Sequence, residues 1–130
     1  MASLKEKAVA LLASKTGVDL NAVAATTLYT VPTGKKSVLD HVKIRELSAS
    51  AGSTVLTIGQ SAAKTDFVGA QTLSNLSAAG KAGKLQPVPN ATPPAIVEYA
   101  AGLNIVADVT TAAGAACTCT MDVYGTEDDA

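Results

Sequence analysis

The segment Thr26–Leu47, TTLYTVPTGKKSVLDHVKIREL, carries the strongest structural signal in the chain. An apolar run rich in β-branched and aromatic residues reaches a Pro32-Thr33-Gly34 turn, and a second strand-like run leaves that turn. This pattern is typical of one strand followed by the next in a small all-β domain. In the second run, apolar and charged residues share the faces of the expected strand. This mixture indicates a partly exposed face or a β-bulge that shifts the alternation.

Further short runs on both sides of this segment are expected to form strands. The last of them, between Cys117 and Tyr124, has the most regular alternation of apolar and polar residues in the chain. We therefore predict a mainly β protein: a jelly-roll-like antiparallel β-sandwich with a short N-terminal α-helix. The expected strands cover residues 23–31, 37–47, 54–58, 65–68, 84–88, 95–99, 103–109 and 117–124.

The helix is predicted over residues 3–15. Ser3 and Glu6 fit an S-x-x-E capping box, and Gly17 fits a stop at the C-terminal end. An isolated helix of this length is marginal in water, so its apolar stripe needs a partner. Such a helix either packs on its own domain or acts as an arm that docks on a neighbouring subunit or another protein. The stripe consists of Leu4, Ala8, Leu11, Leu12 and Lys15.

The length of 130 residues indicates one folding unit with a sizeable core. We divide the chain into a helical arm at residues 1–20, a β-sandwich domain at 21–125 and an acidic tail at 126–130, which we expect to be frayed. Hydrophobic residues make up 48% of the chain but aromatic residues only 3%. A core of small side chains gains less free energy from burial, which favours a homo-oligomer.

Charge and hydropathy argue against two classes of partner. The formal net charge is −1 and no basic block is present, so nucleic-acid binding is disfavoured. No apolar run reaches the roughly 20 residues of a membrane helix. The apolar run after Lys7 is shorter than the core of a typical signal peptide, so we interpret the chain as a mature protein made inside the cell.

Few residues predict catalysis. The segment at residues 34–37 lacks the first glycine and the Gly-Lys-Ser/Thr ending of a phosphate-binding loop. His41 is the candidate general base, but Asp40 would point to the opposite face of an unbroken strand and could not orient it. The aromatic residues are too few to line a sugar cleft. We expect no enzymatic activity and no cofactor. Carboxylates that could in principle pair across strands are Asp66, Glu98, Asp108 and Asp122.

Cys117 and Cys119 lie two residues apart, a spacing that rarely meets disulfide geometry on a strand. We interpret both as small buried hydrophobic residues. With one histidine and no C-x-x-C pair, no metal site is expected.

Three segments together resemble a known group of proteins: TLYTVPTG at Thr27–Gly34, AGLNIVADVTT at Ala101–Thr111 and TCTMDVYG at Thr118–Gly125. In this order they resemble small structural proteins of tailed bacteriophages, in particular capsid decoration (cement) proteins and related virion appendages. The resemblance spans residues 26–125 and leaves the predicted helix outside. It implies a jelly-roll-like subunit, commonly trimeric, on the outer capsid surface where major capsid proteins meet. It implies no catalytic residues.

The expected function is that of a structural virion protein, made in the host cytoplasm, that stabilises a capsid by binding the lattice of the major capsid protein. We expect Leu4, Ala8, Leu11 and Leu12 to form the capsid or subunit interface. The alternative is a receptor- or carbohydrate-binding module of a phage tail or cell-surface appendage, which sugar binding by the isolated domain would favour.

Overall fold

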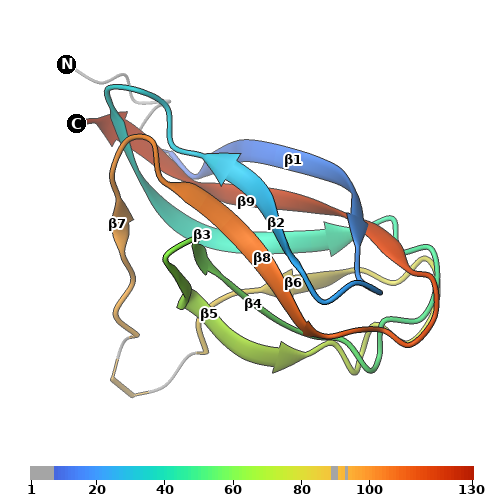
Figure 1. The fold of residues 1–130 in the computed structure, drawn as a ribbon. Coiled ribbons are helices and arrows are strands. Elements are labelled where there is room, and N and C mark those ends of the chain that lie inside the picture. Colours follow the sequence, from blue (N-terminus) through green and yellow to red (C-terminus); the bar gives the residue numbers. More distant parts are fainter. Residues whose placement is uncertain (1–7, 89–90, 93) are drawn as a thin grey trace.

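The protein is a sandwich of two antiparallel β-sheets (Figure 1). The computed structural model describes residues 8–88, 91–92 and 94–130. Sheet A has the strand order β1-β9-β3-β6, with β7 also paired to β3, and sheet B has the order β2-β8-β4-β5. The predicted mainly β, antiparallel sandwich is therefore confirmed. The strands are β1 (Ala10–Asp19), β2 (Ala25–Thr30), β3 (Lys35–Arg45), β4 (Val55–Gln60), β5 (Ala63–Thr72), β6 (Gly83–Leu85), β7 (Glu98–Tyr99), β8 (Asn104–Thr111) and β9 (Thr118–Asp129).

The predicted N-terminal helix is wrong where the structure describes its residues. Residues 10–19 form β1, an outer strand of sheet A paired with β9, while residues 1–7 lie outside the described part of the chain. Irregularities in the β1–β9 register lie between Leu11 and Ala13 and between Lys15 and Val18. These bulges break the two-residue period, so the apolar residues imitate helical spacing. Pairing with β9 then outweighs a helix propensity of a few tenths of a kcal/mol per residue.

Gly17, interpreted from sequence as a helix stop, lies inside β1 at the second of these bulges. Its φ of 65° is in the left-handed region, which glycine adopts without steric penalty. After this bulge Val18 and Leu20 turn into the core, where both are almost fully buried. Gly17 does interrupt a regular element, as predicted, but the interruption is a bulge within strand β1 and not the end of a helix.

The core lies between the two sheets and consists mainly of Leu, Ile and Val. Composition suggested a core of small side chains, yet Ala51 and Ala107 are the only alanines among the buried hydrophobic residues of the described chain. Cys117 and Cys119 are free and buried, as expected. Burial, with a smaller contribution from neighbouring Cys117, raises the pKa of Cys119 to about 12. No helix in the described residues could cross a membrane.

A bulge in β3 confirms the shift of alternation expected from its sequence. The register between β3 and β9 is interrupted between Leu39 and His41, so that Leu39 and Val42 are both buried. On the facing strand, a Cβ atom on Gly125 would lie 2.4 Å from the Val38 carbonyl oxygen and 3.0 Å from Leu39 Cα. Glycine at this position therefore lets the bulged strand approach β9 closely.

The prediction that the acidic tail is frayed is wrong, because β9 continues to Asp129. Its last residues pair with the start of β3, where Lys35 Nζ lies 2.8 Å from Asp129 Oδ1. One residue of β2, Tyr29, donates a hydrogen bond from its hydroxyl to Glu127, and that hydroxyl lies 2.7 Å from Ser37 Oγ. The Lys35–Asp129 ion pair therefore holds the C-terminal residues against sheet A, and the hydrogen bond from Tyr29 to Glu127 links them to sheet B.

The close approach at Gly125 can be tested by substitution. We expect Gly125→Ala to lower the free energy of unfolding by about 1–3 kcal/mol, because the added methyl group meets backbone atoms that cannot move independently. The matched control is Gly69→Ala in β5, where an added Cβ meets no atom within 4 Å. Urea denaturation measures both variants, and an equal loss of stability in the two would contradict the steric explanation.

The buried thiols give a second test. We expect neither Cys117 nor Cys119 to react with a disulfide reagent at pH 8 while the protein is folded, because both are buried. Both thiols should react at once in denaturant. Rapid reaction of the native protein, followed by absorbance, would show that this part of the core opens readily.

Candidate interaction surface on sheet A

The outer face of sheet A carries a row of three side chains from three adjacent strands. Leu11 of β1 lies opposite Tyr124 of β9, and Tyr124 in turn lies opposite His41 of β3. The rings of His41 and Tyr124 are stacked, with centroids 4.6 Å apart and planes 11° from parallel. Leu11 is 54% exposed, so the row presents apolar surface to solvent. We call Leu11, Tyr124 and His41 the aromatic row.

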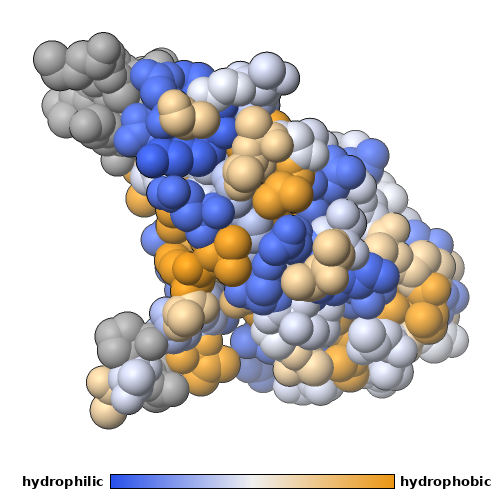
Figure 2. Space-filling model, turned by 60° about the vertical axis from the view of Figure 1, so that its left-hand side comes forward, coloured by the Kyte–Doolittle hydropathy of each residue, from blue (hydrophilic) through white to orange (hydrophobic). Residues whose placement is uncertain are grey.

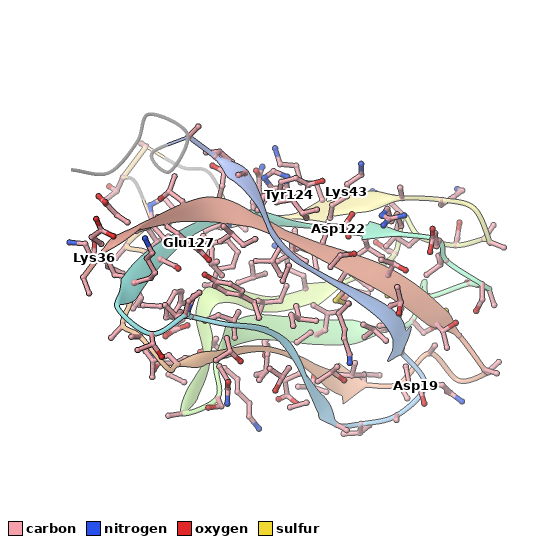
Figure 3. The ribbon with its side chains drawn as sticks, turned by 90° about the horizontal axis from the view of Figure 1, so that it is seen from above. Asp19, Lys36, Lys43, Asp122, Tyr124 and Glu127 are labelled. Atoms are coloured by element: carbon pink, nitrogen blue, oxygen red, sulfur yellow. The ribbon has the colours of Figure 1, made fainter. Side chains whose placement is uncertain are left out.

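A second row beside it is polar. Ser14, Asp122, Lys43 and Lys84 lie opposite one another across β1, β9, β3 and β6. Figure 3 shows Tyr124 and Lys43 on the side of sheet A that faces away from β4 and β5. Asp122 is the most buried residue of this row: its side chain is only 5% exposed, and it accepts two hydrogen bonds. Ser14 Oγ donates to Oδ1 at 2.6 Å, and Arg45 Nε donates to Oδ2 at 2.7 Å.

These bonds set the protonation state of Asp122. Burial by itself raises the pKa of this carboxyl group, but the hydrogen bonds from Arg45 and Ser14 and the positive charges of Arg45 and Lys43 outweigh it. The pKa of Asp122 therefore lies below its usual range, and the group is ionised at neutral pH.

Arg45 also links this row to the end of β3. Its Nη1 donates to Glu46 Oε1 at 2.8 Å, and Thr120 Oγ1 donates to Glu46 Oε2 at 2.8 Å. Glu46 has a φ of 55°, the one positive value among the described residues other than glycine. A conformation of this kind costs on the order of 1 kcal/mol and persists where surrounding contacts hold it. The two hydrogen bonds to the Glu46 carboxylate supply those contacts.

The prediction that Asp40 cannot orient His41 is wrong. Asp40 Oδ2 lies 2.7 Å from His41 Nδ1, although the two residues are adjacent on a strand. The reason is the bulge between Leu39 and His41, which removes the strict alternation assumed from sequence. With one ring nitrogen engaged by Asp40 and one ring face on Tyr124, the imidazole has a fixed position.

The predicted interface residues do not form one stripe. Leu4 lies outside the described residues, and Ala8 is exposed just before β1. Leu11 joins the aromatic row, whereas Leu12 packs inward near Gly125 and is half-buried. Of the four predicted residues, Leu11 is the one that belongs to the aromatic row. The sequence did not predict that Leu11, Tyr124 and His41 lie side by side. The signal was present in the alternation of β9, which places Tyr124 on the polar face.

The four carboxylates considered for catalysis do not form a common site. Among them, Asp66 accepts hydrogen bonds from Tyr99 and Gln60, and Asp122 from Ser14 and Arg45. Glu98 lies 3.7 Å from Lys36. Within the described residues, no group of three or more His, Cys, Asp or Glu side chains could hold a metal ion.

Three hollows formed by described residues border β3, and the one lined by Ile44 together with residues 71–76 and 82–85 measures about 290 Å³. Of the two others, one, of about 310 Å³, is lined by His41, Lys43, Ala82, Gly83 and Lys84. The other, of about 260 Å³, lies at the end of the molecule near β7, where Ile96 is 44% exposed. Figure 2 looks onto that end and shows hydrophobic surface interspersed with hydrophilic residues. Its lining residues are Leu39, Asp40, Gln86, Pro87, Pro94 and Ile96.

The pairing of Asp122 gives a pH-dependent test. Because the folded state holds the pKa of Asp122 below its unfolded value, the group adds stability above the unfolded pKa, and this is lost as the pH falls through the folded pKa. We expect Asp122→Asn to lose about 1–3 kcal/mol at pH 7, because Ser14 and Arg45 then donate to a neutral acceptor in place of a buried carboxylate.

The difference between wild type and Asp122→Asn should shrink as the pH falls below about 4, the usual range of an aspartate in an unfolded chain. Urea denaturation at several pH values measures this difference. A gap that stays constant down to pH 2 would show that ionisation of Asp122 does not stabilise the fold.

Comparison with known proteins establishes the fold and no family. No protein-family model and no curated protein matches the sequence. Among solved structures, the chain is similar to a chain of the structure titled "Cyanophage Pam1 capsid asymmetric unit", with a TM-score of 0.51 and 13% sequence identity. The match covers 91% of this chain and 84% of the other. At this identity the likeness shows a shared fold across nearly the whole sandwich.

Proposed function

We propose that this chain is a structural virion protein that decorates and stabilises the capsid of a tailed bacteriophage by binding the lattice of its major capsid protein. The observation that carries the proposal is the shared fold with a chain from a cyanophage capsid, over 91% of this chain. The resemblance of residues 26–125 to decoration proteins supports it independently. We propose no catalytic activity and no cofactor.

The outer face of sheet A suits protein docking. It combines an aromatic pair with a polar surround, as interfaces do with tyrosine enriched at their centres and polar residues at their rims, and Leu11 adds exposed apolar area. Stacking and hydrogen bonds already hold His41, Tyr124 and Asp122 in place, so docking costs little side-chain entropy. A protein that binds only the assembled lattice stabilises that lattice by mass action.

The proposed location is the outer capsid surface, after synthesis in the host cytoplasm, and the proposed assembly is a homotrimer. The resemblance to decoration proteins supports both. The core gives no independent support for a trimer, because it is built of large aliphatic side chains.

Light scattering across a dilution series tests the trimer. The expected mass is three times the 13.0 kDa of the chain, unchanged on dilution. A monomer at all concentrations would remove the trimer from the proposal and leave a subunit that assembles only on the lattice.

Capsid binding tests the function and the role of the aromatic row together. Capsids would be produced from the phage genome that carries this gene, with the gene deleted, and mixed with purified protein. We expect wild type to sediment with the capsids and Leu11→Asp to bind at least about tenfold more weakly, because a charge replaces an exposed apolar contact.

The matched control is Val23→Asp, which adds the same charge at a 68% exposed valine outside the sheets. Equal loss of binding in both variants would mean that added charge matters and the aromatic row does not. Failure of wild type to bind capsids, together with saturable binding of a glycan, would instead support the receptor- or carbohydrate-binding alternative.

A further inference from the structure

Two lysines face each other on the outer side of sheet A. Lys43 of β3 and Lys84 of β6 are directly opposite in an antiparallel pair, and both side chains are exposed. Like charges in this arrangement repel each other and destabilise the strand pair. Their neighbour across the hollow is His41, so three cationic or potentially cationic side chains line one depression of about 310 Å³.

The nearby carboxylates are engaged elsewhere. Asp122 is next to Lys43 in the polar row and feels its charge, but both of its oxygens accept hydrogen bonds from Ser14 and Arg45 and none from Lys43. Asp40 lies against His41 Nδ1 on the side of the bulge. The hollow itself is lined by the stems of the two lysines, by Ala82 and Gly83, and by His41, with no acidic residue among them.

We propose that His41, Lys43 and Lys84 bind acidic side chains presented by the protein on which this chain docks. An incoming carboxylate would relieve the repulsion between the lysines, and the apolar lining would cover its aliphatic stem. The site continues directly into the aromatic row through His41, so one partner surface would contact both. The inference rests on the proposed function only in taking that partner to be the capsid protein.

The form of the hollow favours a protein carboxylate over a free phosphate ion. Its charges come from flexible lysine side chains on an open sheet face, and no helix start or glycine-rich loop of consecutive amides lies among its lining residues. Acidic side chains projecting from a second surface can reach such a face without being enclosed.

A titration followed by NMR tests the site without capsids. Isotope-labelled full-length protein would be titrated with hexaglutamate, with hexaglutamine and, separately, with inorganic phosphate. We expect saturable shifts at His41, Lys43 and Lys84 with hexaglutamate, none with hexaglutamine, and weaker binding when the salt concentration is raised to about 0.5 M.

Lys84→Glu should weaken hexaglutamate binding by about tenfold or more, because repulsion replaces attraction. Lys64→Glu is the control, since it reverses the charge of an exposed lysine on β5 in the other sheet. Unchanged amide shifts in β8 would verify that each variant is folded, and Lys84→Gln provides a milder version of the change.

Three results would overturn the proposal: no saturable shift with hexaglutamate, equal weakening by Lys64→Glu, or phosphate binding at least as tight as hexaglutamate at the same residues. Capsid sedimentation is a separate measurement. If wild-type protein binds capsids but not hexaglutamate, the proposed function is supported and the proposed binding site for acidic side chains is contradicted.

Discussion

The pairing of β9 with β1 on one side and with β3 on the other is the constraint on which both faces of the molecule depend. The inward residues of β9, including Met121 and Val123, are buried in the core, while Asp122 and Tyr124 are placed on the outer face of sheet A. Gly125 lets the bulged part of β3 lie close against this strand. A shift of β9 by one residue would exchange its two faces and remove the core and the candidate surface together.

The candidate surface is built from ordered polar groups. Ionised Asp122 is held by Ser14 and Arg45, and the Arg45 guanidinium reaches Glu46 as well. Buried carboxylates with full hydrogen bonding restrict their neighbours to one arrangement. The aromatic row lies beside this network on the same face, and Lys43 and Lys84 face each other without an acidic residue in the lining of their hollow. Ordered polar groups beside a pair of like charges are the features on which the proposed docking of this face is based.

Much of the fold could be predicted from sequence, because regular alternation survives in most strands. The run from Cys117 to Tyr124 and the turn at Pro32–Gly34 predicted strand positions, and the mixed faces of the run at 37–47 indicated the bulge in β3 as one of two alternatives. The first strand could not be predicted, since two bulges hide its alternation and its partner lies about 110 positions away. The extension of β9 through its acidic end depends on Lys35 and Tyr29, which only the folded chain brings near.

The surface was harder to predict than the fold. Leu11 was identified as an interface residue, but on a helical stripe with Leu12, which in fact points to the core. His41 was judged to lack a local partner because an unbroken strand was assumed, and the bulge brings Asp40 to it. The opposition of Lys43 and Lys84 depends on the register of two strands far apart in sequence, which alternation within either strand does not determine.

A cryo-electron microscopy reconstruction of tailed-bacteriophage capsids incubated with the purified protein would examine the proposed role directly. We expect density for the sandwich at regular positions on the outer capsid surface, with Leu11, Tyr124 and Lys84 of sheet A against the major capsid protein. Capsids without such density, or a subunit whose sheet A faces solvent while another surface makes the contact, would contradict the role assigned to this face.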